Sequence, residues 1–152
     1  MISIRTLGVG DTAAICAHRY RMYEEMGFEA AKLDAMREPF AAWLKPRLED
    51  GRYFGFVAED GGAVVAGVGL QLLDWPPGPN HPTSDVRGYI LNVFVEPEFR
   101  GRGIARMLMQ RAEEEFRARG VAYGMLHASV KGRPVYEGLG WTMTNQMGKI
   151  LG

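Results

Sequence analysis

The chain of 152 residues contains one cysteine, Cys16, so no internal disulfide can form and a disulfide-stapled scaffold is excluded. No apolar run approaches the roughly 18 residues that cross a membrane. The N-terminal MISIRTLGVGD also lacks the apolar core of a signal peptide. These absences predict a soluble protein with no membrane partner, and we expect it in the reducing cytoplasm.

Net charge is absent as well, because 18 basic residues balance 18 acidic ones. Such a chain has no global field to attract nucleic acid, so no nucleic-acid partner is predicted. His18, His81 and His127 share no metal-ligand spacing, and we predict no metal. A composition of 47% hydrophobic and 24% charged residues is typical of globular proteins. We therefore expect one domain over residues 1–152.

Hydrophobic periodicity and turn residues predict the order β-α-α-β-β-β-α-β-α-β, an α/β fold with a mixed sheet. Asp11 suits the N-cap of the first helix, and Pro39 and Pro46 are expected to interrupt or kink the second. Asp60, Gly61 and Gly62 indicate a tight hairpin turn. The expected elements are a strand at 2–7, helices from 11 to 27 and 30 to 48, a hairpin at 52–75, a strand at 86–96, a helix after 103, a strand at 122–128, a helix at 134–139 and one or two strands at 140–151.

The strand at 86–96 reads YILNVFV at its centre, where strict alternation places Asn92 on the face of Ile90 and Phe94. The opposite face would carry Tyr89 and its alternate neighbours. Both faces are largely apolar, which predicts a central strand covered on both sides.

An arginine/glycine turn follows this strand and leads into an amphipathic helix, in the segment VEPEFRGRGIA. The first amides of a helix have no partner within it, and the helix dipole adds partial positive charge there. Glycines let an anion approach that backbone closely, and Arg100 and Arg102 supply cations nearby. The arrangement suits a pyrophosphate. An ordinary strand-to-helix turn, with arginines that serve solubility, would explain the same residues.

Two common nucleotide-binding motifs are missing. A dinucleotide fingerprint needs a third glycine where this chain has Arg106, and the phosphate loop ending in Gly-Lys-Ser/Thr occurs nowhere. Instead, Arg100-Gly101-Arg102-Gly103-Ile104-Ala105 resembles the Arg/Gln-x-x-Gly-x-Gly/Ala motif of the GNAT N-acetyltransferase superfamily. Downstream, GRPVYEGLGW resembles the closing segment of that family, in which a tyrosine-bearing helix leads to Leu-Gly-aromatic.

The resemblance implies a GNAT-like fold with a splayed central sheet and acetyl-CoA as co-substrate. In the family, the strand before the turn pairs with the pantetheine arm, and the turn holds the pyrophosphate. The cofactor-binding residues implied here are Val93, Phe94, Val95, Arg100, Gly101, Arg102, Gly103, Ile104, Ala105, Arg106 and Ser129.

Tyr136 is the catalytic residue that the resemblance implies, as acid or stabiliser for the departing thiolate. Packing in the core, or a simple contact to coenzyme A, would explain a tyrosine there too. No carboxylate stands on the strand at 89–95, where family members often place the general base, and Asn92 cannot serve as one. More distant carboxylates that remain open are Glu24, Glu25, Asp74 and Asp85.

The predicted function is direct transfer of an acetyl group to a primary amine of a small molecule, amino acid or peptide. Candidate acceptor-site residues are Tyr23, Phe28, Asn92 and His127, and Trp75 with the proline loop is a further candidate wall. The alternative is a non-catalytic acyl-CoA-binding or sensing module, and a homodimer is left open.

Overall fold

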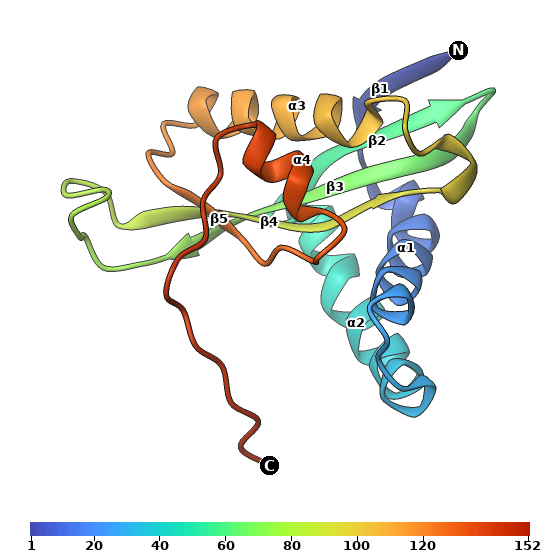
Figure 1. The fold of residues 1–152 in the computed structure, drawn as a ribbon, viewed down its shortest axis with the longest axis horizontal. Helices are drawn as coiled ribbons and strands as arrows, with labels where there is room; N and C mark the ends of the chain where they lie inside the picture. The colour runs from blue at the N-terminus through green and yellow to red at the C-terminus, as the bar shows by residue number, and fades with distance from the viewer.

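A five-stranded mixed sheet with helices on both faces forms the protein in a computed structural model that describes residues 1–152 (Figure 1). The sheet order is β1-β2-β3-β4-β5, antiparallel except for the parallel pair β4–β5. This confirms the predicted class. The strands are β1 (Ile2–Thr6), β2 (Phe54–Asp60), β3 (Ala63–Asp74), β4 (Val86–Val95) and β5 (Gly124–Leu126). The helices are α1 (Thr12–Glu25), α2 (Ala30–Asp50), α3 (Ile104–Ala118) and α4 (Arg133–Gly138), with 3-10 turns at Val9–Asp11 and Pro97–Phe99.

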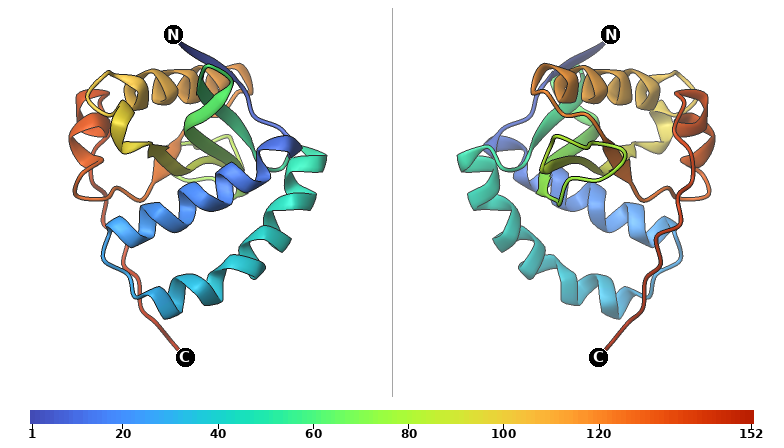
Figure 2. Two further views of the ribbon diagram at one scale, coloured as in Figure 1. Left: turned by 90° about the vertical axis from the view of Figure 1, so that its right-hand side faces the viewer. Right: turned by 90° about the vertical axis from the view of Figure 1, so that its left-hand side faces the viewer.

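Each face of the sheet carries its own apolar core. Helix α3 lies on one face and buries Leu108, Met109, Ala112 and Phe116, a stripe at helical spacing (Figure 2). Helices α1 and α2 cover the other face, where Leu44 and the side chains around it form the second core. Because strand residues alternate between faces, β2 contributes to both cores, and the central strands are covered on both sides as expected.

Turn residues act largely as predicted. Gly61 and Gly62 have φ angles of 57° and 84°, the paired positive values of a tight hairpin turn between β2 and β3. Asp11 precedes α1, but its carboxylate makes no cap bond to that helix; it accepts from Arg5 and from the amide of Gly8. The acid therefore ties β1 to the start of α1.

The alternation predicted for β4 is wrong at its centre. Gly67 of β3 pairs with Phe94 and Gly69 pairs with Leu91, so Asn92 and Val93 together oppose a single residue. This is a β-bulge, and Asn92 adopts a φ of 56°, the left-handed conformation that asparagine tolerates. The bulge turns the Asn92 side chain toward α1 and α2, on the side of Leu91 rather than that of Ile90.

Two other expectations are corrected. The second helix is not interrupted at Pro39 or Pro46, because it runs continuously through both; of the two effects expected there, only a bend of the helix axis is seen (Figure 2). Residues 141–152 form no strand: Trp141 still donates a hydrogen bond to Glu113 of α3, Gln146 still lies beside His127, and only the last residues extend away from the fold (Figure 1). The sheet consequently ends at β5.

Candidate active site

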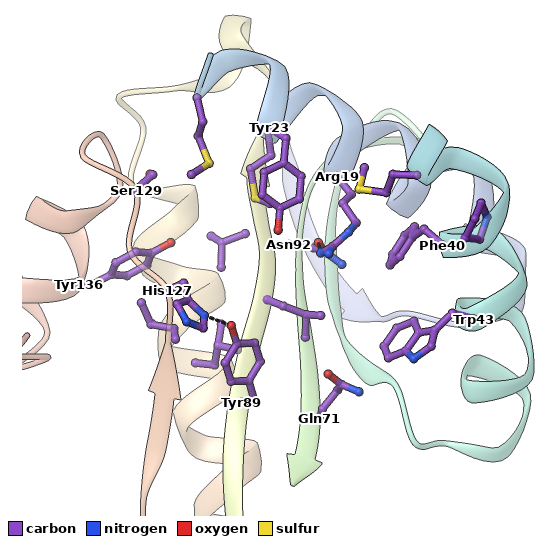
Figure 3. A pocket seen from close by; sticks show the side chains of 18 residues that line it. Arg19, Tyr23, Phe40, Trp43, Gln71, Tyr89, Asn92, His127, Ser129 and Tyr136 are labelled. Atoms are coloured by element: carbon purple, nitrogen blue, oxygen red, sulfur yellow. Dashed lines mark hydrogen bonds between the residues drawn. The ribbon is translucent and has the colours of Figure 1, made fainter. Parts of the chain in front are cut away.

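A cavity of about 550 Å³ lies where β4 and β5 meet α1 and α2 (Figure 3). Its walls are mostly apolar and aromatic. The lining residues are Arg19, Met22, Tyr23, Met26, Met36, Pro39, Phe40, Trp43, Gln71, Tyr89, Ile90, Leu91, Asn92, Val93, Leu126, His127, Ser129 and Tyr136. None of them carries a carboxylate, so the cavity offers no acid to a cationic ligand.

The cavity exists because β4 and β5 separate. They pair only at Gly88, Tyr89 and Ile90, and from Leu91 onward β4 has no strand partner on that edge. This is the splay that the resemblance implied. Val93 and Ser129 line the cavity, whereas the Phe94 ring lies on the α1 side, 4.8 Å from the ring of His18. The unpaired edge can hydrogen-bond an extended, amide-bearing ligand as it would another strand.

The turn before α3 presents a row of free backbone amides. Gly101 and Gly103 both have φ of 78°, and a Cβ at either position would meet no atom within 4 Å. No protein acceptor receives a hydrogen bond from the backbone N–H groups of 101–106, and the first helical bond runs from Met107 to the Gly103 carbonyl. Open space, free donors and a helix N-terminus meet at this corner, which suits an anion.

The arginine side chains of the turn are held elsewhere. Arg100 forms a salt bridge of 2.8 Å to Glu25 of α1 and donates to the Val95 carbonyl at 2.8 Å. Arg102 stacks on Phe99 and donates to the Glu98 carbonyl. Arg100 thus joins α1 to the end of β4, and the backbone amides are the donors that remain available.

Tyr136 enters the cavity from α4 and is buried. Loss of solvation raises the pKa of its phenol to about 12. Gly132 makes room for it, since a Cβ there would lie 3.2 Å from the Tyr136 hydroxyl and 3.1 Å from Oγ of Ser129. Tyr136 is therefore a protonated hydrogen-bond donor facing the splay.

Tyr89 and His127 form a hydrogen-bonded pair across the β4–β5 boundary, between the Tyr89 hydroxyl and Nδ1 of His127. Gln146, from the segment after α4, lies 3.3 Å from the other ring nitrogen. Burial raises the pKa of Tyr89. His127 is the one imidazole that lines the cavity.

A polar cluster closes the opposite wall. Arg19 Nη1 donates to Oδ1 of Asn92 at 2.7 Å, and the Asn92 amide donates to the hydroxyl of Tyr53 at 2.9 Å. Arg19 is not among the residues predicted from the sequence, although it stands one helical turn before Tyr23, which is. The other lining residues that the sequence did not single out include Gln71, Phe40, Trp43 and Tyr89.

Several predicted residues lie outside the cavity. Phe28 packs edge-on against Tyr23 and is 49% exposed. Trp75 holds the Arg87 guanidinium near its ring instead of lining the cavity. None of the four candidate carboxylates, Glu24, Glu25, Asp74 and Asp85, contributes to the lining. No group of three or more histidine, cysteine or acidic side chains is arranged to hold a metal, and no helix is long and apolar enough to cross a membrane.

Comparison with models of known protein families identifies the family of this chain. The model of the acetyltransferase (GNAT) family matches residues 17–141, and the protein belongs to this family. No curated protein matches the chain significantly.

Solved structures of similar proteins cover nearly the whole chain. A GCN5-related N-acetyltransferase from Ralstonia eutropha JMP134 is 49% identical with a TM-score of 0.98, covering 99% of each chain. A predicted acetyltransferase from Clostridium acetobutylicum, described as being with acetyl-CoA, is 26% identical with a TM-score of 0.89, covering 99% of this chain and 96% of its own. An aminoglycoside acetyltransferase from an uncultured soil metagenomic sample shares the fold, at 20% identity and a TM-score of 0.72, covering 99% and 98%.

Proposed function

We propose that this protein transfers the acetyl group of acetyl-CoA directly to a primary amine of a small molecule, amino acid or peptide. The observation that carries the proposal is the buried phenol of Tyr136 in the cavity beside the unpaired edge of β4, with the free amides of 101–106 in the turn that follows the same strand. Membership of the acetyltransferase family and the acetyl-CoA of the Clostridium structure support it.

The residues present fit coenzyme A. The open corner at Gly101 and Gly103 would receive the pyrophosphate, and the β4 edge at Leu91 to Phe94 would pair with the pantetheine amides. Val95 contributes less than expected from the sequence, because its carbonyl already accepts from Arg100. Bound there, acetyl-CoA supplies an already activated acyl group, so no covalent intermediate on the protein is required.

Tyr136 would serve as the hydrogen-bond donor to the departing sulfur. Its pKa of about 12 keeps the phenol protonated at neutral pH, ready to donate. A thiol is a stronger acid, with an ordinary pKa of about 8.5, so stabilisation of a thiolate by the O–H group is favoured over complete proton transfer. The role is electrostatic support of charge that develops during the reaction.

His127 is the proton acceptor that the cavity offers to the attacking amine. It lines the cavity where no carboxylate does, and its bond to Tyr89 fixes the ring orientation. An imidazole held in this way can take a proton directly or through the Tyr89 hydroxyl. This pair fills the place of the missing strand carboxylate.

The test is release of free thiol from acetyl-CoA with a broad panel of primary amines, together with calorimetric measurement of acetyl-CoA binding. Thiol release that depends on the amine, with the N-acetyl product identified by mass spectrometry, is the expected result. Binding without release across the whole panel would instead establish the sensing module. If acetyl-CoA does not bind, both the acetyltransferase and the sensing module are refuted.

A further inference from the structure

We propose that the acceptor amine carries a carboxylate, which Arg19 binds, and an apolar or aromatic body, as in a hydrophobic amino acid. This inference rests on the proposed acetyl transfer and names the substrate class for the same cavity. The juxtaposition that carries it is a guanidinium with unused donors set into an otherwise uncharged, aromatic-lined cavity.

Arg19 has hydrogen-bonding capacity that the protein leaves unused. Nη1 donates to Asn92, Nη2 has no protein acceptor, and Nε is buried without a hydrogen-bond partner. The guanidinium carbon lies 5.0 Å from the ring centre of Tyr23 and 4.6 Å from that of Phe40, and Figure 3 shows Arg19 between these two rings. Asn92 and the rings thus fix the orientation of the cation without neutralising its charge.

Charge complementarity favours an anionic group on the ligand. Arg19 is the one arginine or lysine among the lining residues, and no aspartate or glutamate lines the cavity. Holding a cation in apolar surroundings costs free energy unless an anion or other acceptors compensate. A planar carboxylate matches the guanidinium, and the Tyr23 hydroxyl, which points toward Asn92 in Figure 3, supplies a second donor nearby.

The remaining lining indicates the body of the acceptor. Thioether and aromatic side chains dominate the walls, and methionines adapt their shape to varied apolar ligands. These residues are Met22, Met26, Met36, Phe40, Trp43 and Tyr89. A polycationic acceptor would meet Arg19 and no acid, so aminoglycoside-like amines are disfavoured.

The decisive comparison pairs each amino acid with its decarboxylated amine, such as phenylalanine with phenethylamine and methionine with 3-(methylthio)propylamine. We expect kcat/KM for the acid to exceed that for the amine by roughly 10- to 150-fold, the range of a hydrogen-bonded charge contact. Arg19→Gln should collapse this ratio toward one, and Arg19→Lys should retain part of it. Arg37→Gln, a control at an arginine of α2 that pairs with Asp34 outside the cavity, should leave the ratio unchanged.

The outcomes separate this inference from the proposed function. Equal acetylation of acids and decarboxylated amines by the native enzyme would refute recognition of a carboxylate and leave the proposed acetyl transfer intact. Recognition by Arg19 is also refuted if Arg19→Gln folds and keeps the native ratio. If no member of the panel releases thiol although acetyl-CoA binds, the proposed function fails first. The substrate comparison uses the native chain, so it does not depend on a variant that folds.

Discussion

The side-chain amide of Asn92 donates a hydrogen bond of 2.9 Å to the hydroxyl of Tyr53, which is 2% exposed. This bond joins the bulge of β4 to the core under α2. Gly69 makes the approach possible, because a Cβ on it would lie 2.0 Å from the Tyr53 oxygen. Asn92 in turn accepts a hydrogen bond from Arg19. Tyr53 therefore helps to position the Arg19 guanidinium in the cavity through Asn92.

Tyr53→Phe should therefore destabilise the fold by about 1–3 kcal/mol, the cost of leaving a buried amide without its partner. Urea unfolding measures this change. Tyr20→Phe removes a hydroxyl that bonds Asp34 near the surface and should cost less than about 1 kcal/mol. Equal stabilities of the Tyr53 variant and the native protein would show that Asn92 finds another partner.

Gly103→Val should weaken acetyl-CoA binding by roughly tenfold or more, because a side chain would enter the space before the free amides of 101–106. Isothermal titration calorimetry gives the dissociation constant. Valine at a φ of 78° also strains the backbone by at least about 1 kcal/mol, so stability must be followed in parallel.

Gly62→Val supplies the matched control. Gly62 has a φ of 84° at the β2–β3 turn and equally open surroundings, but it does not belong to the turn that carries the free amides of 101–106. It should lose similar stability and keep its affinity for acetyl-CoA. If both variants lose affinity in parallel, the loss is an effect of folding, and the hypothesis that the pyrophosphate binds at the turn of 101–106 is refuted.

Much of the fold was predictable because local patterns decide it. The 3.6-residue stripe of α3 and the paired glycines at 61 and 62 act within a few residues, and both predictions are confirmed. The bulge at Asn92 depends on a hydrogen bond to Tyr53, 39 positions away, which no local pattern reveals. The C-terminal segment reads as a strand, yet a strand forms only where an edge accepts it.

Only those site residues that belong to local sequence motifs could be predicted. The glycine turn and Tyr136 stand in recognisable local sequences. Arg19, Tyr89 and Trp43 line the cavity through packing between elements, and their own neighbours in sequence give no signal. The prediction for Phe28 followed the apolar cluster near Tyr23, but the chain has already left α1 there and the ring faces solvent.

Tyr136→Phe should lower kcat roughly 100-fold or more while changing the acetyl-CoA dissociation constant by less than about threefold. The reason is that the O–H group would act on the departing sulfur, whereas the ring that packs in the site is retained. Single-turnover kinetics and calorimetry measure the two quantities separately. Comparable losses in both would make Tyr136 a binding residue.

His127→Gln should lower kcat roughly 100-fold or more, because glutamine can hydrogen-bond at this position but cannot take a proton from the attacking amine. Tyr89→Phe removes the hydrogen-bond partner of the ring but keeps the imidazole, so it should give a smaller loss. Steady-state kinetics measure both losses, and a His127→Gln enzyme with the native kcat would exclude the imidazole as proton acceptor.

Alkaline unfolding offers a test of the buried phenol that does not depend on activity. Burial raises the pKa of Tyr136 from 10.0 to about 12, so the folded chain holds this proton after the unfolded chain has released it. Its contribution is complete below pH 10 and is lost as the pH rises from 10 to 12, up to about 3 kcal/mol.

Urea unfolding between pH 9 and 11.5 should therefore show the native protein losing more stability than Tyr136→Phe. Burial raises the pKa of Tyr53 as well, so Tyr53→Phe should reduce the alkaline loss in the same sense. If the native protein and the Tyr136 variant lose stability in parallel across this range, then the phenol titrates normally in the fold. A normal titration would mean that water reaches the hydroxyl freely, and Tyr136 would then lack the dry surroundings that make a hydrogen-bond donor effective toward a departing thiolate.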